Sequence, residues 1–368
     1  MRIAIDATES FWPKLTGTGV YVRNLVKLLL SWNLGEELFI LGIHARDTDA
    51  GYVRPDALRL LRSPTYRTLW TQGRLPLHLL RRRYDLLHLP DHKLPFWVPC
   101  RTIVTILDLA YMKFPDMFTR NHRERLAWFT RDAVSRATHT IAISHSTRND
   151  VCDLLGVSPE RVSTVQLAVD HERFRPDAPP ARRDAPYILS VGALQPRKNF
   201  QLLLRAFKKL CSRRKARVDL IIVGQKGWMW EPIEREAAEG PSADRIHLKG
   251  YVPEEELASL YTGAALVAMP SLYEGFGLPL LEAMACGAPV IAANISSFPE
   301  VAGDAGILLP PDDEEAWVEA MDHLLDDEQQ RGAMRSRSIA RAGQFTWERT
   351  ARETLAVYRK TLLQERRA

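Results

Sequence analysis

Short apolar runs alternate with longer segments of helical spacing along the whole chain. This alternation is typical of parallel strands joined by crossover helices. Most of the runs are apolar on both faces, as strands covered by helices on both sides must be. The predicted strands are Arg2–Asp6, Leu38–Gly42, Leu86–Leu89, Thr102–Leu107, Thr140–Ser144, Tyr187–Val191, Asp219–Val223, Ile246–Lys249, Ala265–Met269 and Pro289–Ala292.

A proline-rich segment divides the pattern into two halves of similar size. Residues 175–186 hold four prolines and cannot continue a helix or a central strand, so they predict a linker. We therefore expect an α/β protein with two doubly wound domains, residues 1–178 and 179–345. Residues 346–368 have helical apolar spacing and are expected to form a C-terminal helix that docks toward the first domain. Such sheets bind ligands beyond the carboxyl ends of their strands, and two of them facing each other would enclose a cleft.

Composition excludes several classes of protein. Among 368 residues, 50 Lys and Arg stand against 45 Asp and Glu, a net charge of +5 that is too mild for a dedicated nucleic-acid binder. The excess lies in residues 1–180, with 25 basic and 19 acidic side chains. The four cysteines are far apart and suit neither a disulfide framework nor a metal site. With no signal-peptide pattern and no long apolar stretch, we expect a cytoplasmic protein.

The most informative segment runs from Ser271 to Gly287. A Gly-x-Gly loop of Gly275, Phe276, Gly277 and Leu278 follows a predicted strand, and Pro279 is placed to open a helix. Glycines there let backbone N–H groups approach a diphosphate, and the positive end of the helix favours the same anion. Glu282, expected in the first turn of that helix, could accept hydrogen bonds from ribose hydroxyls. Glu274, before the glycines, would lie closer to a transferred group.

Two further elements could serve a phosphate. Arg197 and Lys198 follow the strand that opens the second half and are placed to neutralise a leaving diphosphate, a solvated pair of charges being the alternative. Gly17 and Gly19 follow the first strand and precede a helical segment, where they could approach a phosphate or sugar. For Gly17 and Gly19, the alternative is a plain turn between strand and helix.

The carboxylates Glu274 and Glu282, with seven residues between them that include Gly-Phe-Gly, together with Pro196–Asn199 and Gly250–Pro253, resemble the retaining glycosyltransferases of family 4 with the GT-B fold. The resemblance implies two Rossmann-like domains, the first on the acceptor side and the second holding a nucleotide diphosphate sugar. It implies hexose transfer with retained configuration, without a metal ion or any cofactor besides the donor. The implied roles are diphosphate binding for Arg197 and Lys198, ribose binding for Glu282, contact with the donor sugar for Glu274, a base pocket for Tyr251 and Val252, and contact with sugar or phosphate for Gly17 and Gly19.

One position departs from the family pattern. Many relatives have His-Asp-Leu where this chain has Leu107-Asp108-Leu109, so a histidine of the family's cleft is replaced. Asp108 remains as a candidate contact to donor or acceptor, with a helix or turn cap as the alternative. Retaining transfer by attack on the same face needs support for the leaving group more than a protein base. His122 or His145 could otherwise substitute.

Partners follow from less specific features. Eight arginines fall between Arg54 and Arg83, a basic and partly apolar segment that suits an anionic membrane surface or a lipid diphosphate acceptor, or else a solvated helix face. The stretch Val223–Trp228 resembles bacterial mannosyltransferases of O-antigen or exopolysaccharide assembly, which implies GDP-mannose as donor and a saccharide or lipid-linked acceptor. The alternatives are a nucleotide-sugar epimerase or hydrolase on the same fold and a non-catalytic sugar-binding protein. A nicotinamide-dependent oxidoreductase lacks its glycine fingerprint here.

Overall fold

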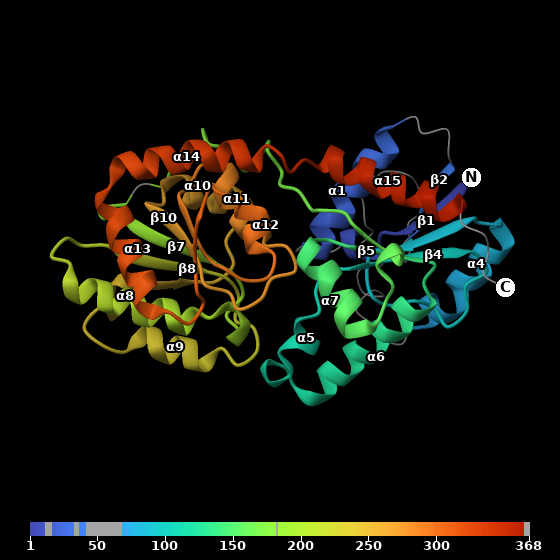
Figure 1. Ribbon diagram of the computed structural model, residues 1–368, viewed down its shortest axis with the longest axis horizontal. Helices are drawn as coiled ribbons and strands as arrows, with labels where there is room; N and C mark the ends of the chain where they lie inside the picture. Colours follow the sequence, from blue (N-terminus) through green and yellow to red (C-terminus); the bar gives the residue numbers. More distant parts are fainter. Residues whose placement is uncertain (12–16, 33–36, 42–67, 182, 364–368) are drawn as a thin grey trace. The chain divides into compact units, whose positions relative to one another are not determined.

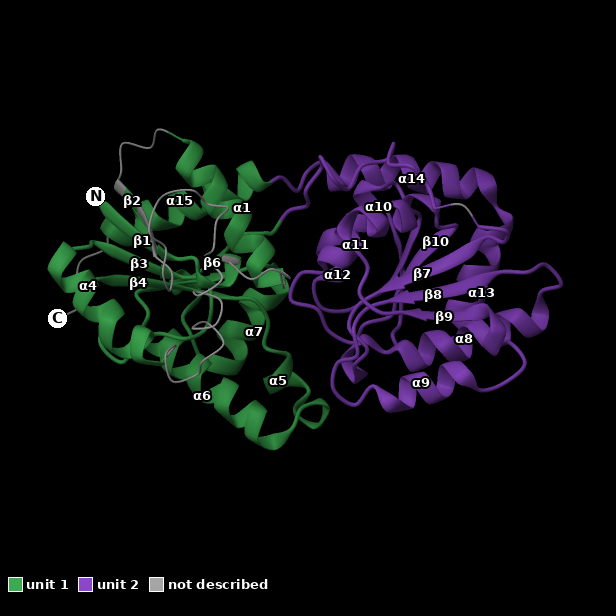
Figure 2. Ribbon diagram, turned by 180° about the vertical axis from the view of Figure 1, so that it is seen from behind, with its two compact units in different colours: residues 1–167, 347–368 green, residues 168–346 purple. Residues whose placement is uncertain are grey.

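A computed structural model of the chain describes residues 1–11, 17–32, 37–41, 68–181 and 183–363. The chain divides into two compact units, each with its own parallel sheet (Figures 1 and 2). Unit 1 comprises residues 1–167 and 347–368, and unit 2 comprises residues 168–346. None of the described helices combines the length and the apolar character that crossing a bilayer requires.

Unit 1 is built on a parallel sheet with the strand order β2-β1-β3-β4-β5-β6. Its strands are β1 (Arg2–Asp6), β2 (Glu37–Leu41), β3 (Leu86–Leu89), β4 (Arg101–Ile106), β5 (His139–Ala142) and β6 (Val162–Thr164). Its α-helices are α1 (Gly17–Ser31), α4 (Leu75–Arg82), α5 (Ala110–Lys113), α6 (Arg120–Arg136), α7 (His145–Leu155) and α15 (Trp347–Leu363). Shorter helical segments are η1 (Thr8–Phe11), η2 (Trp70–Arg74), η3 (Pro115–Met117) and η4 (Pro159–Arg161).

Unit 2 repeats the architecture with the strand order β12-β11-β10-β7-β8-β9, again all parallel. Its strands are β7 (Tyr187–Val191), β8 (Asp219–Val223), β9 (Ile246–Lys249), β10 (Leu266–Met269), β11 (Val290–Ala293) and β12 (Ile307–Leu309). Its α-helices are α8 (Phe200–Arg213), α9 (Glu231–Ala238), α10 (Glu254–Gly263), α11 (Leu278–Ala285), α12 (Phe298–Ala302), α13 (Glu314–Asp326) and α14 (Glu328–Ala342), with the short segments η5 (Pro196–Lys198) and η6 (Ala243–Arg245).

Every strand predicted from the sequence is present, with ends shifted by at most two residues. The strands β3, β7 and β8 lie wholly inside their units, which explains their continuous apolar runs. The sequence missed β6 and β12, which are short strands at the edges of their sheets. Each has only three residues, which is too short a run to stand out in the sequence, although β12 is apolar throughout.

The division between the units differs from the predicted one, since it falls between Leu167 and Ala168 and not after residue 178. The residues just before the prolines pack on unit 2: Phe174 meets the ring of Tyr261 edge to face at 6.0 Å, and Arg173 forms an ion pair with Glu254. Prolines mark where regular structure stops, and the contacts of the preceding segment decide which unit it joins.

The C-terminal helix α15 is part of unit 1 and packs against α1. Thr350 donates a hydrogen bond to the carbonyl of Gln166, 2.7 Å away. Deeper in the unit, the buried His88 of β3 lies between the hydroxyls of Tyr358, at 2.6 Å, and Thr105, at 2.8 Å. Burial lowers the pKa of His88 to about 3, so its imidazole is neutral and joins α15 to the sheet through hydrogen bonds.

Candidate active site

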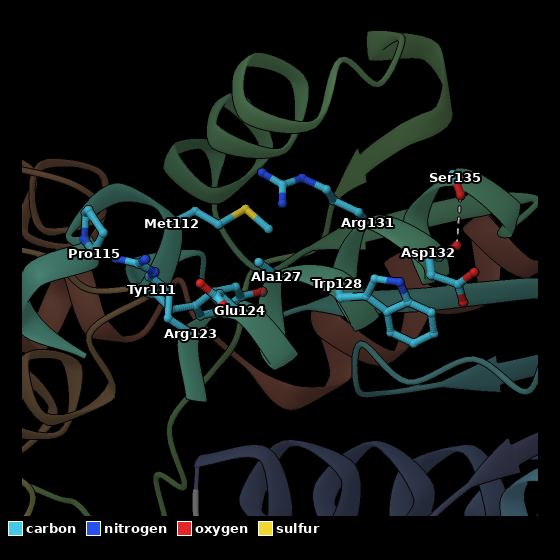
Figure 3. A pocket seen from close by; sticks show the side chains of 10 residues that line it. All are labelled: Tyr111, Met112, Pro115, Arg123, Glu124, Ala127, Trp128, Arg131, Asp132 and Ser135. Atoms are coloured by element: carbon cyan, nitrogen blue, oxygen red, sulfur yellow. Dashed lines mark hydrogen bonds between the residues drawn. The ribbon is translucent and has the colours of Figure 1, made fainter. Parts of the chain in front are cut away.

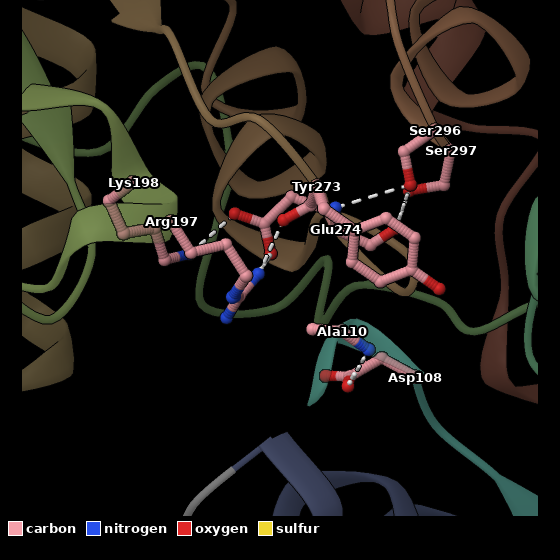
Figure 4. Close-up of polar contacts among 8 residues, drawn as sticks. All are labelled: Asp108, Ala110, Arg197, Lys198, Tyr273, Glu274, Ser296 and Ser297. Carbon is pink, nitrogen blue, oxygen red and sulfur yellow. Dashed lines mark hydrogen bonds and ion pairs between the residues drawn. The ribbon is translucent and has the colours of Figure 1, made fainter. Parts of the chain in front are cut away.

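Two cations and one carboxylate meet at the carboxyl end of the sheet in unit 2 (Figure 4). Arg197 and Lys198 belong to η5, which follows β7, and Glu274 lies in the loop after β10. Because β7 and β10 are parallel neighbours, their carboxyl ends adjoin. The Lys198 Nζ lies 2.5 Å from Glu274 Oε1, and the Arg197 Nη1 lies 3.0 Å from Glu274 Oε2.

This cluster of Arg197, Lys198 and Glu274 is buried, with side chains 12%, 9% and 9% exposed. Burial alone raises the pKa of Glu274, but the attraction of Lys198 and Arg197 outweighs that effect and lowers the pKa to about 2. The carboxylate is therefore ionised, and the cluster carries one net positive charge. A positive cluster at the carboxyl end of a doubly wound sheet suits an anionic ligand.

Neighbouring loops hold this cluster in place. Gly192, at the end of β7, leaves room for the lysine stem, because a Cβ there would come within 3.0 Å of Lys198 Cε. Ser296 and Ser297, beyond the end of β11, both bind the backbone of Glu274 (Figure 4). Ser297 Oγ donates to the Glu274 carbonyl at 3.0 Å, and the Glu274 N–H donates to Ser296 Oγ at 3.2 Å. The position of the carboxylate is thus set by three loops of the same sheet.

The glycine loop leads directly into α11. Gly277 adopts a φ of 96°, a conformation that favours glycine, and a Cβ there would lie 2.8 Å from the ring of Phe298. The turn at Gly277 leads into α11, whose first residue is the partly buried Leu278. The N-terminus of the helix therefore lies shortly after Gly275. Phe276 is buried and packs edge to face on Phe345, so its side chain belongs to the core. Only its backbone is suited to face a ligand.

Glu282 lies in the second turn of α11 and not in the first, because the helix begins only at Leu278. Its partly buried carboxylate accepts a hydrogen bond from the Tyr261 hydroxyl, 3.1 Å away. Burial raises the pKa of Glu282 to about 7, against the lowering effects of the Tyr261 bond and of Arg173. A carboxylate that titrates near neutral pH at the carboxyl end of a sheet is a candidate for ligand contact.

The residues expected to line a base pocket follow β9 in the same unit. The side chain of Tyr251 is exposed, whereas that of Val252 is buried. The N–H of Gly224, at the end of β8, donates to the carbonyls of Lys249 and Gly250 and ties this loop to the neighbouring strand. These residues share the carboxyl edge of the sheet with the Arg197, Lys198 and Glu274 cluster, separated from β7 by β8.

The remaining candidates lie in unit 1. Gly17 and Gly19 form the first turn of α1, the former exposed and the latter buried, and the loop expected before them falls largely outside the described residues. Asp108 follows β4 and accepts a hydrogen bond from the N–H of Ala110 at 3.1 Å, so its carboxylate caps the turn into α5 (Figure 4). His122 and His145 are exposed on α6 and α7.

The basic segment from Arg54 to Arg83 is only partly described. Residues 54–67 lie outside the described residues, while η2 and α4 carry Arg74, Arg81 and Arg82. Leu77 and Leu80 of α4 are both 51% exposed, so this helix has an apolar as well as a basic outer face. In the part of the chain that the structure describes, no cluster of three or more His, Cys, Asp or Glu side chains could hold a metal ion.

Comparison with known proteins decides the family. The family described as "Glycosyl transferases group 1" matches residues 172–341, and the one described as "Glycosyltransferase Family 4" matches residues 15–173. The O-antigen chain mannosyltransferase B of Escherichia coli is 31% identical over 381 residues, spanning 96% of this chain and 99% of that protein. The chain belongs to glycosyltransferase family 4.

Other similarities agree with this family 4 assignment. The MMP alpha-(1->4)-mannosyltransferase of Mycolicibacterium hassiacum is 28% identical over 418 residues, which is 98% of both proteins. The crystal structure of Anabaena HepE in complex with UDP-glucose matches with a TM-score of 0.72 at 16% identity, covering 98% of this chain and 100% of that one. The fold is therefore GT-B, with two Rossmann-like units, and the enzyme is a glycosyltransferase.

Sequence reasoning missed three residues of this glycosyltransferase that shape the candidate site. Ser296 and Ser297 were detectable, because polar residues in the loop after a predicted strand lie at the edge where ligands bind. Tyr261, which donates to Glu282, gave no signal. It sits in the apolar stripe of α10, where an aromatic residue reads as part of the core.

Proposed function

We propose that this glycosyltransferase moves mannose from GDP-mannose to a saccharide or lipid-linked saccharide acceptor, with retained anomeric configuration and without a metal ion. The observation that carries the proposal is the buried pair Arg197 and Lys198 beside the start of α11. The sugar is supported by two relatives named as mannosyltransferases and by the stretch Val223–Trp228. Binding of a nucleotide sugar is supported by the UDP-glucose complex of HepE, a structural relative.

In the proposed reaction the bond between the sugar C1 and the diphosphate oxygen breaks. A bond from the acceptor hydroxyl oxygen to C1 forms on the same face of the sugar. The hydroxyl proton passes to an oxygen of the departing diphosphate, so the chain supplies no base, in keeping with Leu107 where relatives have histidine. Negative charge grows on the diphosphate as the bond breaks, and Arg197 and Lys198 together with the N–H groups at the start of α11 stabilise it.

Glu274 has two functions in this proposal. Its carboxylate balances part of the charge of Arg197 and Lys198 when no donor is bound, which keeps both cations in place. When the donor is bound, one carboxylate oxygen accepts a hydrogen bond from the sugar. Glu282 accepts from the ribose hydroxyls, and Gly275, Gly277, Tyr251 and Val252 complete the donor site.

The acceptor belongs to unit 1 in the proposal, where Gly17, Gly19 and Asp108 lie at the carboxyl end of the sheet. O-antigen assembly is the activity in the name of the E. coli relative. An acceptor of that kind, held on a lipid, would bring the enzyme to the inner face of the membrane as a peripheral protein.

Transfer from GDP-mannose to a panel of mannose oligosaccharides, monitored by product mass and by the anomeric proton signals, tests the proposal. Lys198→Ala is expected to lower turnover on the order of 10²-fold, as loss of support for developing charge does. Glu282→Ala is expected to lower transfer by weakening donor binding, because the ribose hydroxyls lose their acceptor. Lys209→Ala is the matched control, because Lys209 pairs with Glu315 on the surface of α8. Release of free mannose without dependence on acceptor would identify a hydrolase, and normal rates in both site variants would refute the assignment of the site.

A further inference from the structure

Unit 1 exposes three large aromatic side chains in one place. Phe96 and Trp97 lie in the loop between β3 and β4, and they are 64% and 52% exposed. Trp128 of α6 is 51% exposed, and its ring meets Phe96 edge to face at 6.1 Å. Large apolar side chains gathered on the surface of a protein mark a place that another molecule covers.

Hydrogen bonds hold the aromatic loop in this exposed position. Leu94 and Pro95 are buried, so the loop is anchored on one side of Phe96. Arg136 of α6 donates to the carbonyls of Pro95, at 2.8 Å, and Phe96, at 3.1 Å. The N–H of Phe96 donates to Gln72 Oε1 at 2.8 Å. The backbone is fixed from two other elements, so the exposed rings are preorganised for a partner.

Around the rings, the charged side chains without an ion-pair partner among the described residues are arginines. Arg125 and Arg131 lie three residues before and after Trp128, on the same face of α6, and both are exposed. Neither forms a salt bridge with any residue that the structure describes. The two acidic residues of α6 form salt bridges, Glu124 with Arg120 at 2.8 Å and Asp132 with Arg136.

A groove of about 730 Å³ continues this surface along α6 toward α5 and η3 (Figure 3). Trp128, Arg131 and Asp132 lie along it, and Tyr111, Met112 and Pro115 form its far part. The groove therefore combines aromatic rings and aliphatic surface with guanidinium groups and with the carboxylates of Glu124 and Asp132, which are paired with arginines. Acyl chains and anionic headgroups offer the matching chemistry.

We propose that Phe96, Trp97 and Trp128, with Arg125 and Arg131, form a docking surface for the headgroup region of an anionic lipid bilayer. Tryptophan and phenylalanine insert at the boundary between headgroups and acyl chains, and arginine binds the negative surface. This inference rests on the proposed function in one respect, since it names the surface on which a lipid-linked acceptor would be met. It moves the membrane contact from the segment 54–83 to the loop between β3 and β4 and to α6.

Flotation of the full chain with vesicles tests the docking surface. We expect the chain to float with vesicles of phosphatidylethanolamine and phosphatidylglycerol and to float poorly with phosphatidylcholine. The double variant Phe96→Ser/Trp97→Ser should bind anionic vesicles at least about tenfold more weakly, because two rings no longer insert. Arg125→Gln/Arg131→Gln should lose roughly 30-fold at low salt and less at high salt, at about 1 kcal/mol for each arginine.

The matched control is Leu77→Ser/Leu80→Ser, which removes exposed apolar side chains from the basic helix α4 and should leave flotation unchanged. Calorimetric titration with GDP should give the same affinity in every variant, so failure of docking and failure of the donor site are distinguishable. The proposal is overturned if the wild-type chain does not float, if the Phe96 and Trp97 variant floats normally, or if only the α4 variant loses binding. It is also overturned if soluble mannan shifts the tryptophan emission while vesicles do not.

Discussion

Replacing Glu274 by glutamine removes the negative charge between two buried cations. Lys198 and Arg197 then face each other without a counter-charge, in surroundings where their side chains are only 9% and 12% exposed. Removing one partner of a buried ion pair costs about 3–5 kcal/mol. The pKa of Glu274 gives a similar figure, because lowering it from 4.5 to about 2 corresponds to roughly 3 kcal/mol at 1.36 kcal/mol per pKa unit. We expect Glu274→Gln to lower the free energy of unfolding by about 3 kcal/mol at pH 7.

The pH dependence of this loss has a definite sign. Glu274 has a lower pKa in the folded chain than in the unfolded one, so its contribution is present above about pH 4.5 and is lost as the pH falls toward 2. Urea unfolding of wild type and Glu274→Gln should therefore differ at pH 7 and at pH 5, and converge as the pH is lowered to 3 and beyond. A nucleoside diphosphate should raise the melting temperature of the variant more than that of wild type, because it restores the missing negative charge.

Glu315 provides the matched control. It also contacts two cations, Lys209 and Arg213, which lower its pKa to about 2 chiefly through their hydrogen bonds. The Glu315 side chain is 40% exposed, so solvent replaces these contacts and Glu315→Gln should leave stability nearly unchanged. Equal losses in the two variants, or no loss in Glu274→Gln, would show that burial does not strengthen the ion pairs of Glu274.

Two further predictions follow from single contacts. The pKa of Glu282 is about 7 and the ribose hydroxyls need its ionised carboxylate as acceptor, so the GDP affinity of wild type should fall by up to about tenfold per pH unit below pH 7. Glu282→Gln should bind GDP weakly, with little dependence on pH. Calorimetric titration between pH 5.5 and 8.5 measures both affinities, and a flat wild-type profile contradicts the ribose-binding role of Glu282. Tyr358→Phe removes a hydrogen-bond partner of the buried His88 and should lower the free energy of unfolding by about 1–3 kcal/mol, with amide hydrogen exchange becoming faster in α15 than in unit 2. Uniform changes in exchange would show that α15 is held by apolar packing alone.

The fold was largely predictable because its strands are buried on both faces. Continuous apolar runs such as Tyr187–Val191 identify central strands from the sequence, whereas an edge strand such as β12 has only three residues and is too short to stand out. The boundary between the units was not predictable, because it depends on the contact of Phe174 with Tyr261 of α10 in unit 2. That contact joins residues far apart in the sequence.

The candidate site was predictable as a set of residues and not as an arrangement. Glycine, proline and charge at strand ends pointed to Arg197, Lys198 and Glu274, whose charges the structure brings together. Their ion pairs form because β7 lies next to β10, and the order of strands in a sheet cannot be predicted from local sequence patterns. Phe276 was expected among the donor-binding residues, and its ring proves to be part of the core. Local sequence shows which residue types are present, but not which way each side chain turns.

The central claim is that unit 2 holds a diphosphate between Arg197, Lys198 and the start of α11. Calorimetric titration of wild type and Lys198→Ala with GDP and with GMP tests it most directly. We expect wild type to bind GDP much more tightly than GMP, and Lys198→Ala to lose most of that difference. Equal affinity of wild type for GDP and GMP, or an unchanged preference in Lys198→Ala, would contradict it.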